Sequence, residues 1–389
     1  MFALAVALFT VASLACGLAL SLPAFVAARL LQGAAAAFMS PVGRIVVLEE
    51  TPKAWLLQAI GTLTWPALVA PVIGPVIGGA IIEVASWRWI FLLNVPIGIA
   101  GVLLVLRYIP QRLPTTRKPF DGAGFALTGV ALAALVVGLT RVGEPGDALA
   151  SSLGLVAFGS LLGLLAVRHA RRTPAPLLSL APVAVPTFFH ASLGAGLWAR
   201  IVNVAVTFLL PLMFQLAFGM SALRAGALIL FYMAGNLLVK AVTIAAIERF
   251  GFRGVLVVNG VLCAATLVAC GMLGPDSALP LVAAVLFVAG ASRSMHLGAI
   301  TALAFVDVGT QQRAGASALA TMLMQLCQAF AVAGATTALT LVRVLRGGQA
   351  LTLFDFRLVL YALAAIMLLS ALDARKLARG NGGVASAAT

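Results

Sequence analysis

The sequence predicts an all-α polytopic membrane protein, and three observations carry that prediction. Hydrophobic residues make up 62% of the 389 positions, and the mean hydropathy of the chain is +1.13. Charged residues contribute only 9%, whereas soluble domains contain about 25%. Apolar stretches of about 20 residues, the length that crosses a bilayer core, recur along the whole chain. No soluble fold has this composition.

By that length criterion the chain contains twelve transmembrane spans. Several exceed 25 residues and therefore require tilt, kinks or ends that protrude into water. They run over 2–21, 24–48, 54–83, 89–108, 122–140, 152–168, 186–217, 222–247, 253–273, 278–306, 314–341 and 353–372.

The placement of Lys and Arg sets the orientation of these spans. With residue 1 in the cytoplasm, 14 of the 25 basic residues fall in cytoplasmic segments, 6 in outside segments and 5 within spans. Because basic loops favour the cytoplasmic side, we expect an inner (plasma) membrane protein with both termini in the cytoplasm. Basic loops on an anionic leaflet also explain the net charge of +14, so no nucleic-acid partner is implied.

The stretch around the third span is rich in glycine and proline. Gly74, Pro75, Gly78 and Gly79 interrupt a long apolar pattern, which in lipid predicts a bent helix rather than a broken one. Gly74 and Gly78 lie four residues apart on one face, where missing side chains let another backbone approach closely. Residues 87–96, which contain aromatic side chains and an arginine, follow this helix and are predicted to form a turn at the membrane interface.

Two proline-rich polar loops, 109–121 and 168–186, interrupt the spans and are predicted to be cytoplasmic linkers. The helix pair between them, 122–168, is almost free of polar side chains, so we expect it to be peripheral and to face lipid. The third large segment, 186–372, carries the remaining spans.

The sequence offers no catalytic or metal-binding cluster. The four cysteines lie inside apolar spans without CxxC spacing, and the three histidines, His169, His190 and His296, are far apart. We therefore expect neither an enzyme nor a cofactor or metal site.

Several motifs resemble the drug:proton antiporters of the major facilitator superfamily. The glycine- and proline-rich helix followed by the turn WRWIFLLNVPIG at 87–98 resembles the antiporter motif of the fourteen-helix branch typified by EmrB and QacA. ARLLQG at 28–33 is similar to the arginine motif of the same branch, and ERFGFR at 248–253 is similar to a basic loop of its second half. Pro41 to Arg44 and the region of Gln325 are similar to the MdtD- and HsrA-type members. The resemblance covers nearly the whole chain.

One departure from the family pattern is important. In that branch the arginine and antiporter motifs lie on the fourth and fifth helices, but here they lie on the second and third spans. The resemblance therefore implies a fourteen-helix chain that lacks its first two helices, against the alternative of a complete twelve-helix protein. It divides the chain into an incomplete N-terminal bundle at 1–109, linkers plus an extra helix pair at 110–185, and a six-helix bundle with a cytoplasmic tail at 186–389.

The candidate transport residues come from the arginine and antiporter motifs and from polar side chains within spans, where a charge is costly and asks for a partner or water. The functional interpretation is a substrate cavity or a proton relay, and the alternative for each residue is a structural hydrogen bond. The transport-motif candidates are Arg29, Gln32, Gly33, Gly74, Pro75, Gly78 and Gly79. The candidate cavity residues are Arg200, Asn203, Asn236, Lys240, Arg293, His296, Gln325 and Gln328. Arg44 is expected to reach the cytoplasmic interface.

The acidic residues lie in or beside loops, apart from Glu83 near the outer end of its span. At least four cations thus lie within spans without a carboxylate at the same depth. Since the family carries a coupling aspartate on its first helix, we hypothesise that the missing segment supplied it and that the present chain is impaired in transport.

From these motifs and residues we expect an efflux transporter that exchanges drug-like amphiphiles for protons by alternating access. Its partners would be the small-molecule substrate, protons, the bilayer and, as a further candidate, a periplasmic adaptor. The alternatives are an exporter of a metabolite or amino acid and a truncated, non-transporting membrane remnant.

Overall fold

The computed structural model describes residues 2–50, 70, 74, 77–109, 121–141, 149–174, 176–177, 179–309 and 312–377. Some predictions concern residues outside this set: most of the span at 54–83, including Pro75, and the linker residues 110–120. The side chain of Arg44 is also outside it.

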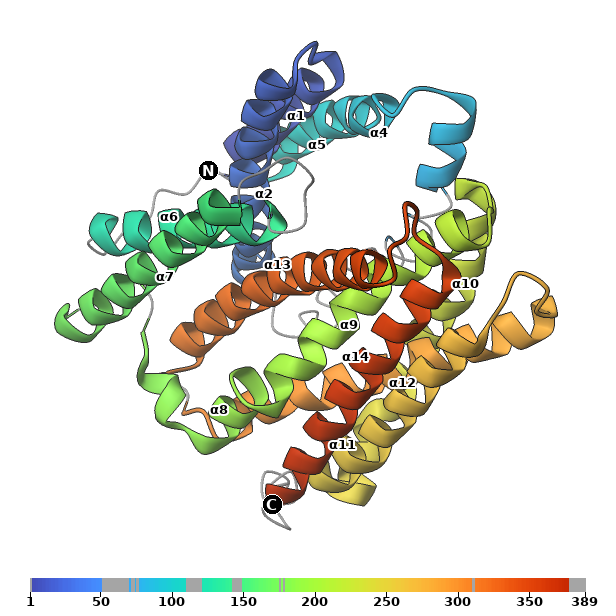
Figure 1. The fold of residues 1–389 in the computed structure, drawn as a ribbon. Helices are drawn as coiled ribbons and strands as arrows, with labels where there is room; N and C mark the ends of the chain where they lie inside the picture. Colours follow the sequence, from blue (N-terminus) through green and yellow to red (C-terminus); the bar gives the residue numbers. More distant parts are fainter. Residues whose placement is uncertain are drawn as a thin grey trace. The chain divides into compact units, whose positions relative to one another are not determined.

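Within the described ranges every regular element is a helix. The chain divides into two compact units, residues 1–117 with 222–227 and residues 118–221 with 228–389. Each unit is built from long helices packed side by side (Figure 1). The three-part domain division expected from the sequence stays a prediction.

Unit 1 is organised around α1 (Phe2–Leu18), which packs against α2 (Leu22–Glu50) and α5 (Asn94–Tyr108), with the short α4 (Trp89–Leu92) beside it. Small side chains on α1, including Ala12, Ser13 and Cys16, are fully buried. Gly98 of α5 lies so close to Thr10 that a β-carbon there would overlap its hydroxyl. Small residues at these contacts let the helix backbones approach closely.

The first part of unit 2 is a helix pair, α6 (Gly122–Arg141) and α7 (Leu149–Arg172), which Figure 1 shows side by side. Glycines hold the two backbones together: a β-carbon on Gly159 would lie 2.8 Å from the amide nitrogen of Leu135. The pair is not surrounded by lipid on all sides, because α6 also packs against α13 (Arg313–Leu345).

The rest of unit 2 is a helical bundle. Its contacts join α11 to α12 and α14, α9 to α13 and α14, and α8 to α12. Its further elements are η2 (Ala181–Ala184), α8 (Pro186–Ser192), α9 (Ala195–Leu212), η3 (Met213–Ala217), α11 (Lys240–Met272), α12 (Leu279–Val306), α14 (Leu353–Asp373) and η5 (Ala374–Lys376). Helix α10 (Ala222–Leu238) belongs to this unit from residue 228 onward, and its first six residues belong to unit 1.

Two backbone irregularities mark where the long apolar runs change direction. Gly251, with φ 68° and ψ 164°, interrupts α11 and confirms the boundary expected between the spans at 222–247 and 253–273. The first of these spans is itself divided, because α10 ends at Leu238 and α11 begins at Lys240. Pro211 lies inside α9, and the π-helical turn η3 follows it. A proline ring removes one backbone donor and perturbs the helix around it.

The lengths agree with a polytopic membrane protein. Among the described residues nine helices are long and apolar enough to cross a bilayer, and α1 and α10 are apolar but shorter, at 17 residues each. The all-α polytopic fold expected from composition is confirmed.

Candidate functional site

The arginine motif on α2 forms a hydrogen-bonded chain that reaches α1. Arg29 donates to the side-chain oxygen of Gln32, and the Gln32 amide donates to Ser13 Oγ at 2.6 Å. Ser13 in turn donates to the carbonyl of Phe9 at 2.8 Å. Gln32 is 3% exposed, whereas Arg29 is exposed and lies with Cζ 5.5 Å from the centre of the Phe91 ring. Arg29 and Gln32 thus lie on one face of α2, and Gly33 is exposed beside them.

In the glycine- and proline-rich stretch, the glycine that lies close to another backbone is not one of the two that the sequence predicted, Gly74 and Gly78. Within the described part of the chain, no atom lies within 4 Å of a β-carbon built on Gly74 or Gly78. A β-carbon on Gly79 would instead lie 3.0 Å from the carbonyl oxygen of Ala222, in the same unit. Because successive helix residues are turned by about 100°, the close contact falls on a neighbouring face.

The turn after this helix is an aromatic cluster. The rings of Phe25, Trp87 and Phe91 meet edge to face with centroids 5.4–6.0 Å apart. Arg88 lies over the Trp87 ring at 4.8 Å and donates to the carbonyl of Ala19. Helix α5 begins within this turn, at Asn94. An indole with an adjacent cation suits the membrane interface.

In unit 2 a buried tyrosine joins two of the expected cavity residues. The Tyr232 hydroxyl on α10 donates to Asn203 Oδ1 on α9 at 3.4 Å, and Arg293 Cζ on α12 lies 5.7 Å from the centre of the Tyr232 ring. Tyr232 is 2% exposed. Sequence reasoning did not select it, although it stands one turn before Asn236 and is one of only three tyrosines.

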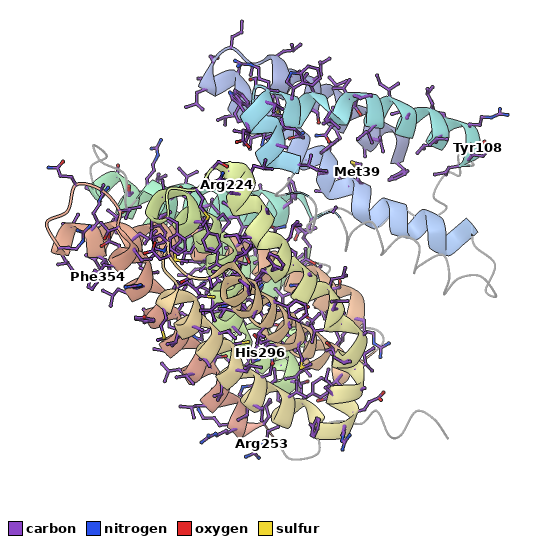
Figure 2. The ribbon with its side chains drawn as sticks, turned by 90° about the vertical axis from the view of Figure 1, so that its right-hand side faces the viewer. Met39, Tyr108, Arg224, Arg253, His296 and Phe354 are labelled. Atoms are coloured by element: carbon purple, nitrogen blue, oxygen red, sulfur yellow. The ribbon has the colours of Figure 1, made fainter. Side chains whose placement is uncertain are left out.

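Arg293 and His296 lie one turn apart on α12, and both are 3% exposed. Among the described residues, none of the three guanidinium nitrogens of Arg293 has a hydrogen-bond partner, and neither has Nδ1 of His296. Figure 2 shows His296 near the middle of the bundle, with Arg253 at its lower end. A buried cation without an acceptor is costly, which makes this pair a candidate functional feature of the bundle core.

The other expected cavity residues do not join this cluster. Arg200 donates to the carbonyl of Ala191 at 2.7 Å. Lys240 is exposed at the first turn of α11, and Asn236 is half-buried. Gln325 and Gln328 lie on an exposed face of α13, while Cys327 between them is buried. Within the described ranges, no three His, Cys, Asp or Glu side chains gather as metal ligands would.

A polar junction outside the spans holds the helix pair to the linker. Asp121 accepts hydrogen bonds from the backbone of Gly124 at 2.8 Å and of Leu177 at 3.0 Å, and its Oδ1 lies 2.9 Å from His169 Nε2. These hydrogen bonds, first those from the two amides and then that of His169, lower the pKa of Asp121 to about 2. The carboxylate is therefore charged at physiological pH.

Comparison with known sequences gives a consistent result. The family model of the Major Facilitator Superfamily matches residues 1–332. A protein named putative multidrug resistance protein MdtD from Citrobacter koseri is 34% identical over 336 residues, which cover 85% of this chain and 70% of that protein. The protein of the same name from Salmonella typhimurium is 33% identical over 334 residues, with the same coverage.

Solved structures with the same fold are transporters. A bacterial homologue of the human lysosomal transporter Spinster, in an inward-facing and unoccupied conformation, aligns with a TM-score of 0.63 at 17% identity over 96% of this chain and 81% of its own. A POT family transporter in complex with 5-aminolevulinic acid aligns with a TM-score of 0.62 at 13% identity, over 96% and 80%. At these identities the likeness concerns the fold alone.

Proposed function

Because the chain belongs to the Major Facilitator Superfamily and is a multi-pass membrane transporter, we propose that it exports drug-like amphiphiles in exchange for protons. The observation that carries the proposal is the 34% identity, over 85% of the chain, to a relative named as a multidrug resistance protein. The fold is compatible with alternating access, in which helical bundles move around a site at the membrane midplane.

The polar side chains within the spans give the proposal a physical basis. Ionisable groups buried in a membrane protein usually mark substrate or proton pathways, since lipid offers them no solvation. Of the candidate residues, Arg29 is exposed but donates to the buried Gln32, and Arg293 is buried against the Tyr232 ring. We assign the first pair to the transport motif and the second to the substrate cavity.

The test is transport by the full 389-residue chain in proteoliposomes with an acidic lumen. An antiporter that lets protons leave the lumen will accumulate ethidium or deoxycholate, the cationic and anionic probes of the assay, and nigericin will abolish the accumulation. Protein-free vesicles serve as the control. Accumulation of amino acids instead of both probes would favour the metabolite exporter. Vesicles that transport none of these compounds would contradict the proposal and favour a non-transporting remnant.

We further propose that the chain resides in the inner (plasma) membrane with both termini in the cytoplasm, and that a periplasmic adaptor is a candidate partner. The support is the distribution of basic residues between the predicted loops. Copurification of the detergent-solubilised chain with a periplasmic protein from a membrane extract tests the adaptor, and recovery of the chain alone argues against it.

A further inference from the structure

A small cavity lies in unit 2 where α8, α12 and α14 meet. Its volume is about 20 Å³, and its lining includes His190 and Ala191 of α8, His296 of α12, and Ser370 and Asp373 of α14. A water molecule needs about 10–15 Å³. The cavity therefore has room for one water molecule and is far too small for a drug-like substrate.

His296 forms the inner end of this cavity. The side chain is 3% exposed, and its Nδ1 has no hydrogen-bond partner among the described residues. The ring packs against the backbone of α11, where a β-carbon on Gly260 would lie 3.3 Å from His296 Cε1. A buried imidazole beside a water-sized space that His190, Ser370 and Asp373 also line is suited to bind a proton carried by water.

His190 and Asp373 form the outer end. Their side chains are 36% and 29% exposed, and His190 Nδ1 lies 3.9 Å from Asp373 Oδ2. Asp373 also pairs with Lys376 at 2.7 Å. Both groups thus contact solvent on one side and the cavity on the other. By the distribution of basic residues, this end of the bundle is the one expected to face the cytoplasm.

The charges around His296 explain why its protonation would matter. Arg293 stands one turn away on the same helix and is equally buried. Arg200 of α9 donates to Ala191 beside the cavity, and Cys263 of α11, with its thiol near Asn259, is buried and neutral as a thiol. Among the side chains that line the cavity, the partly exposed Asp373 is the acidic one. Protonation of His296 would place two buried positive charges one turn apart, and like charges in a low dielectric repel strongly.

We propose that His296 is a proton-binding site of this transporter and that the cavity with His190 and Asp373 is its route to solvent. In release, the proton on His296 Nδ1 passes to the oxygen of the cavity water, which gives another of its protons to His190 or Asp373. No other bond changes. The proposal rests on the proton exchange of the proposed function, and repulsion from Arg293 supplies the energy that links proton binding to a change of conformation.

The test uses the full chain in proteoliposomes and the substitution His296→Gln, which keeps a polar side chain of similar size but does not titrate. We expect proton-driven accumulation of ethidium to fall at least tenfold, while exchange of ethidium at equal pH on both sides continues. His190→Gln and Asp373→Asn should slow proton-driven accumulation less. His169→Gln, which retains a donor for Asp121, is the matched control and should behave as the unsubstituted chain.

A spectroscopic measurement separates failure of this inference from failure of the proposed function. In protein labelled with ¹⁵N-histidine, the signals absent from His296→Gln identify the His296 nitrogens. We expect these signals to titrate with the pH of the solution, and the titration to be slowed by Asp373→Asn. Proton-driven transport that survives His296→Gln, or a His296 signal that does not titrate, would overturn the inference. Loss of proton-driven transport in the unsubstituted chain, with a titrating His296, would instead contradict the proposed function.

Discussion

Arg293 and Arg346 are two arginines of the same bundle in opposite surroundings. Arg293 lies against the Tyr232 ring and, within the described residues, has no acceptor for its nitrogens. Arg346 forms two hydrogen bonds of 3.0 Å with Asp355, a side chain with 0% exposure. The carboxylate of Asp355 also closes the first turn of α14 through Thr352. The same substitution at these two positions should therefore have opposite effects on stability.

We predict that Arg293→Met leaves the melting temperature of the detergent-solubilised protein unchanged or raises it by about 2–4 °C, which is what about 1 kcal/mol gives in a domain of this size. Replacing a buried charge by an apolar side chain of similar length removes its desolvation cost. Transport of the probes should be lost, because we place Arg293 in the substrate cavity. The measurement is thermal unfolding together with proteoliposome uptake.

Arg346→Met is the matched control, because it leaves the Asp355 carboxylate buried without its cation and should lower the melting temperature by several degrees. A similar fall for Arg293→Met would mean that Arg293 holds the bundle together. Its assignment to the cavity would then be wrong.

At the scale of elements, the crossing of α10 and α12 depends on two glycines. A β-carbon on Gly290 would lie 2.7 Å from the carbonyl carbon of Tyr232, and one on Gly235 would lie 2.9 Å from that of Phe287. The two backbones are therefore in direct contact, as small residues allow between helices in a membrane. This contact brings Tyr232 next to the helix that carries Arg293 and His296.

We predict that Gly290→Ala destabilises the protein by about 1–3 kcal/mol, the usual cost of overpacking a close contact. The measurement is the melting temperature in detergent, which should fall by several degrees. Gly154→Ala on α7 is the control, since no atom lies within 4 Å of its added β-carbon. There alanine should be neutral or stabilise by about 0.5–1 kcal/mol. Equal effects of the two substitutions would show that α10 and α12 do not touch at Gly290.

The junction at Asp121 gives a prediction about pH. Its pKa is lowered to about 2, so the stabilising contacts of the carboxylate are complete above the unfolded value of about 3.9 and are lost only as the pH falls toward 2. Protection of the Leu177 amide against hydrogen exchange should therefore be constant, apart from the intrinsic exchange rate, between about pH 5 and 8. In Asp121→Ala the amide should exchange roughly fivefold faster, since a capping acceptor is lost.

Asp276→Ala, in the exposed loop after α11, is the control for that measurement and should leave the Leu177 amide protected. A protection factor that changes between pH 5 and 8 would show that a group other than the Asp121 carboxylate limits the opening of the linker.

At the scale of the molecule, composition and span length were sufficient for the fold class, because the bilayer imposes one length on every crossing helix. The same rule explains why helix breaks were less well predicted. Gly251 marks its break by a conformation that favours glycine, whereas Val239, at the division between α10 and α11, keeps helical backbone angles, and the sequence there offers no such marker. Spacing also did not predict which glycine makes the close backbone contact: Gly79 does so, whereas Gly74 and Gly78 were expected to.

The candidate site was predicted in part. The pairing of Arg29 with Gln32 and the common burial of Arg293 with His296 follow from helical spacing, which the sequence contains. Tyr232 and the cavity with His190 and Asp373 depend on contacts between α8, α10, α12 and α14, and no local pattern specifies which turns of separate helices meet. Lys240 was predicted to lie within a span, and its side chain is exposed at the first turn of α11.

The orientation of the whole chain is testable because its four cysteines are buried and should not react with a membrane-impermeant maleimide. The segment of α11 after Gly251 has about 20 residues, which rise about 30 Å, the thickness of a bilayer core. Glu248 and Asp276 lie in exposed positions beyond its two ends. They should therefore stand on opposite sides of the membrane.

We predict that Asp276→Cys is labelled from outside intact cells, whereas Glu248→Cys is labelled only after permeabilisation. The reason is the 14 to 6 excess of basic residues in the segments expected to be cytoplasmic. The unsubstituted chain, which should remain unlabelled, is the control for the native cysteines. Labelling of Glu248→Cys alone in intact cells would invert the orientation, and would place the His190 and Asp373 end of the proton route on the outer side.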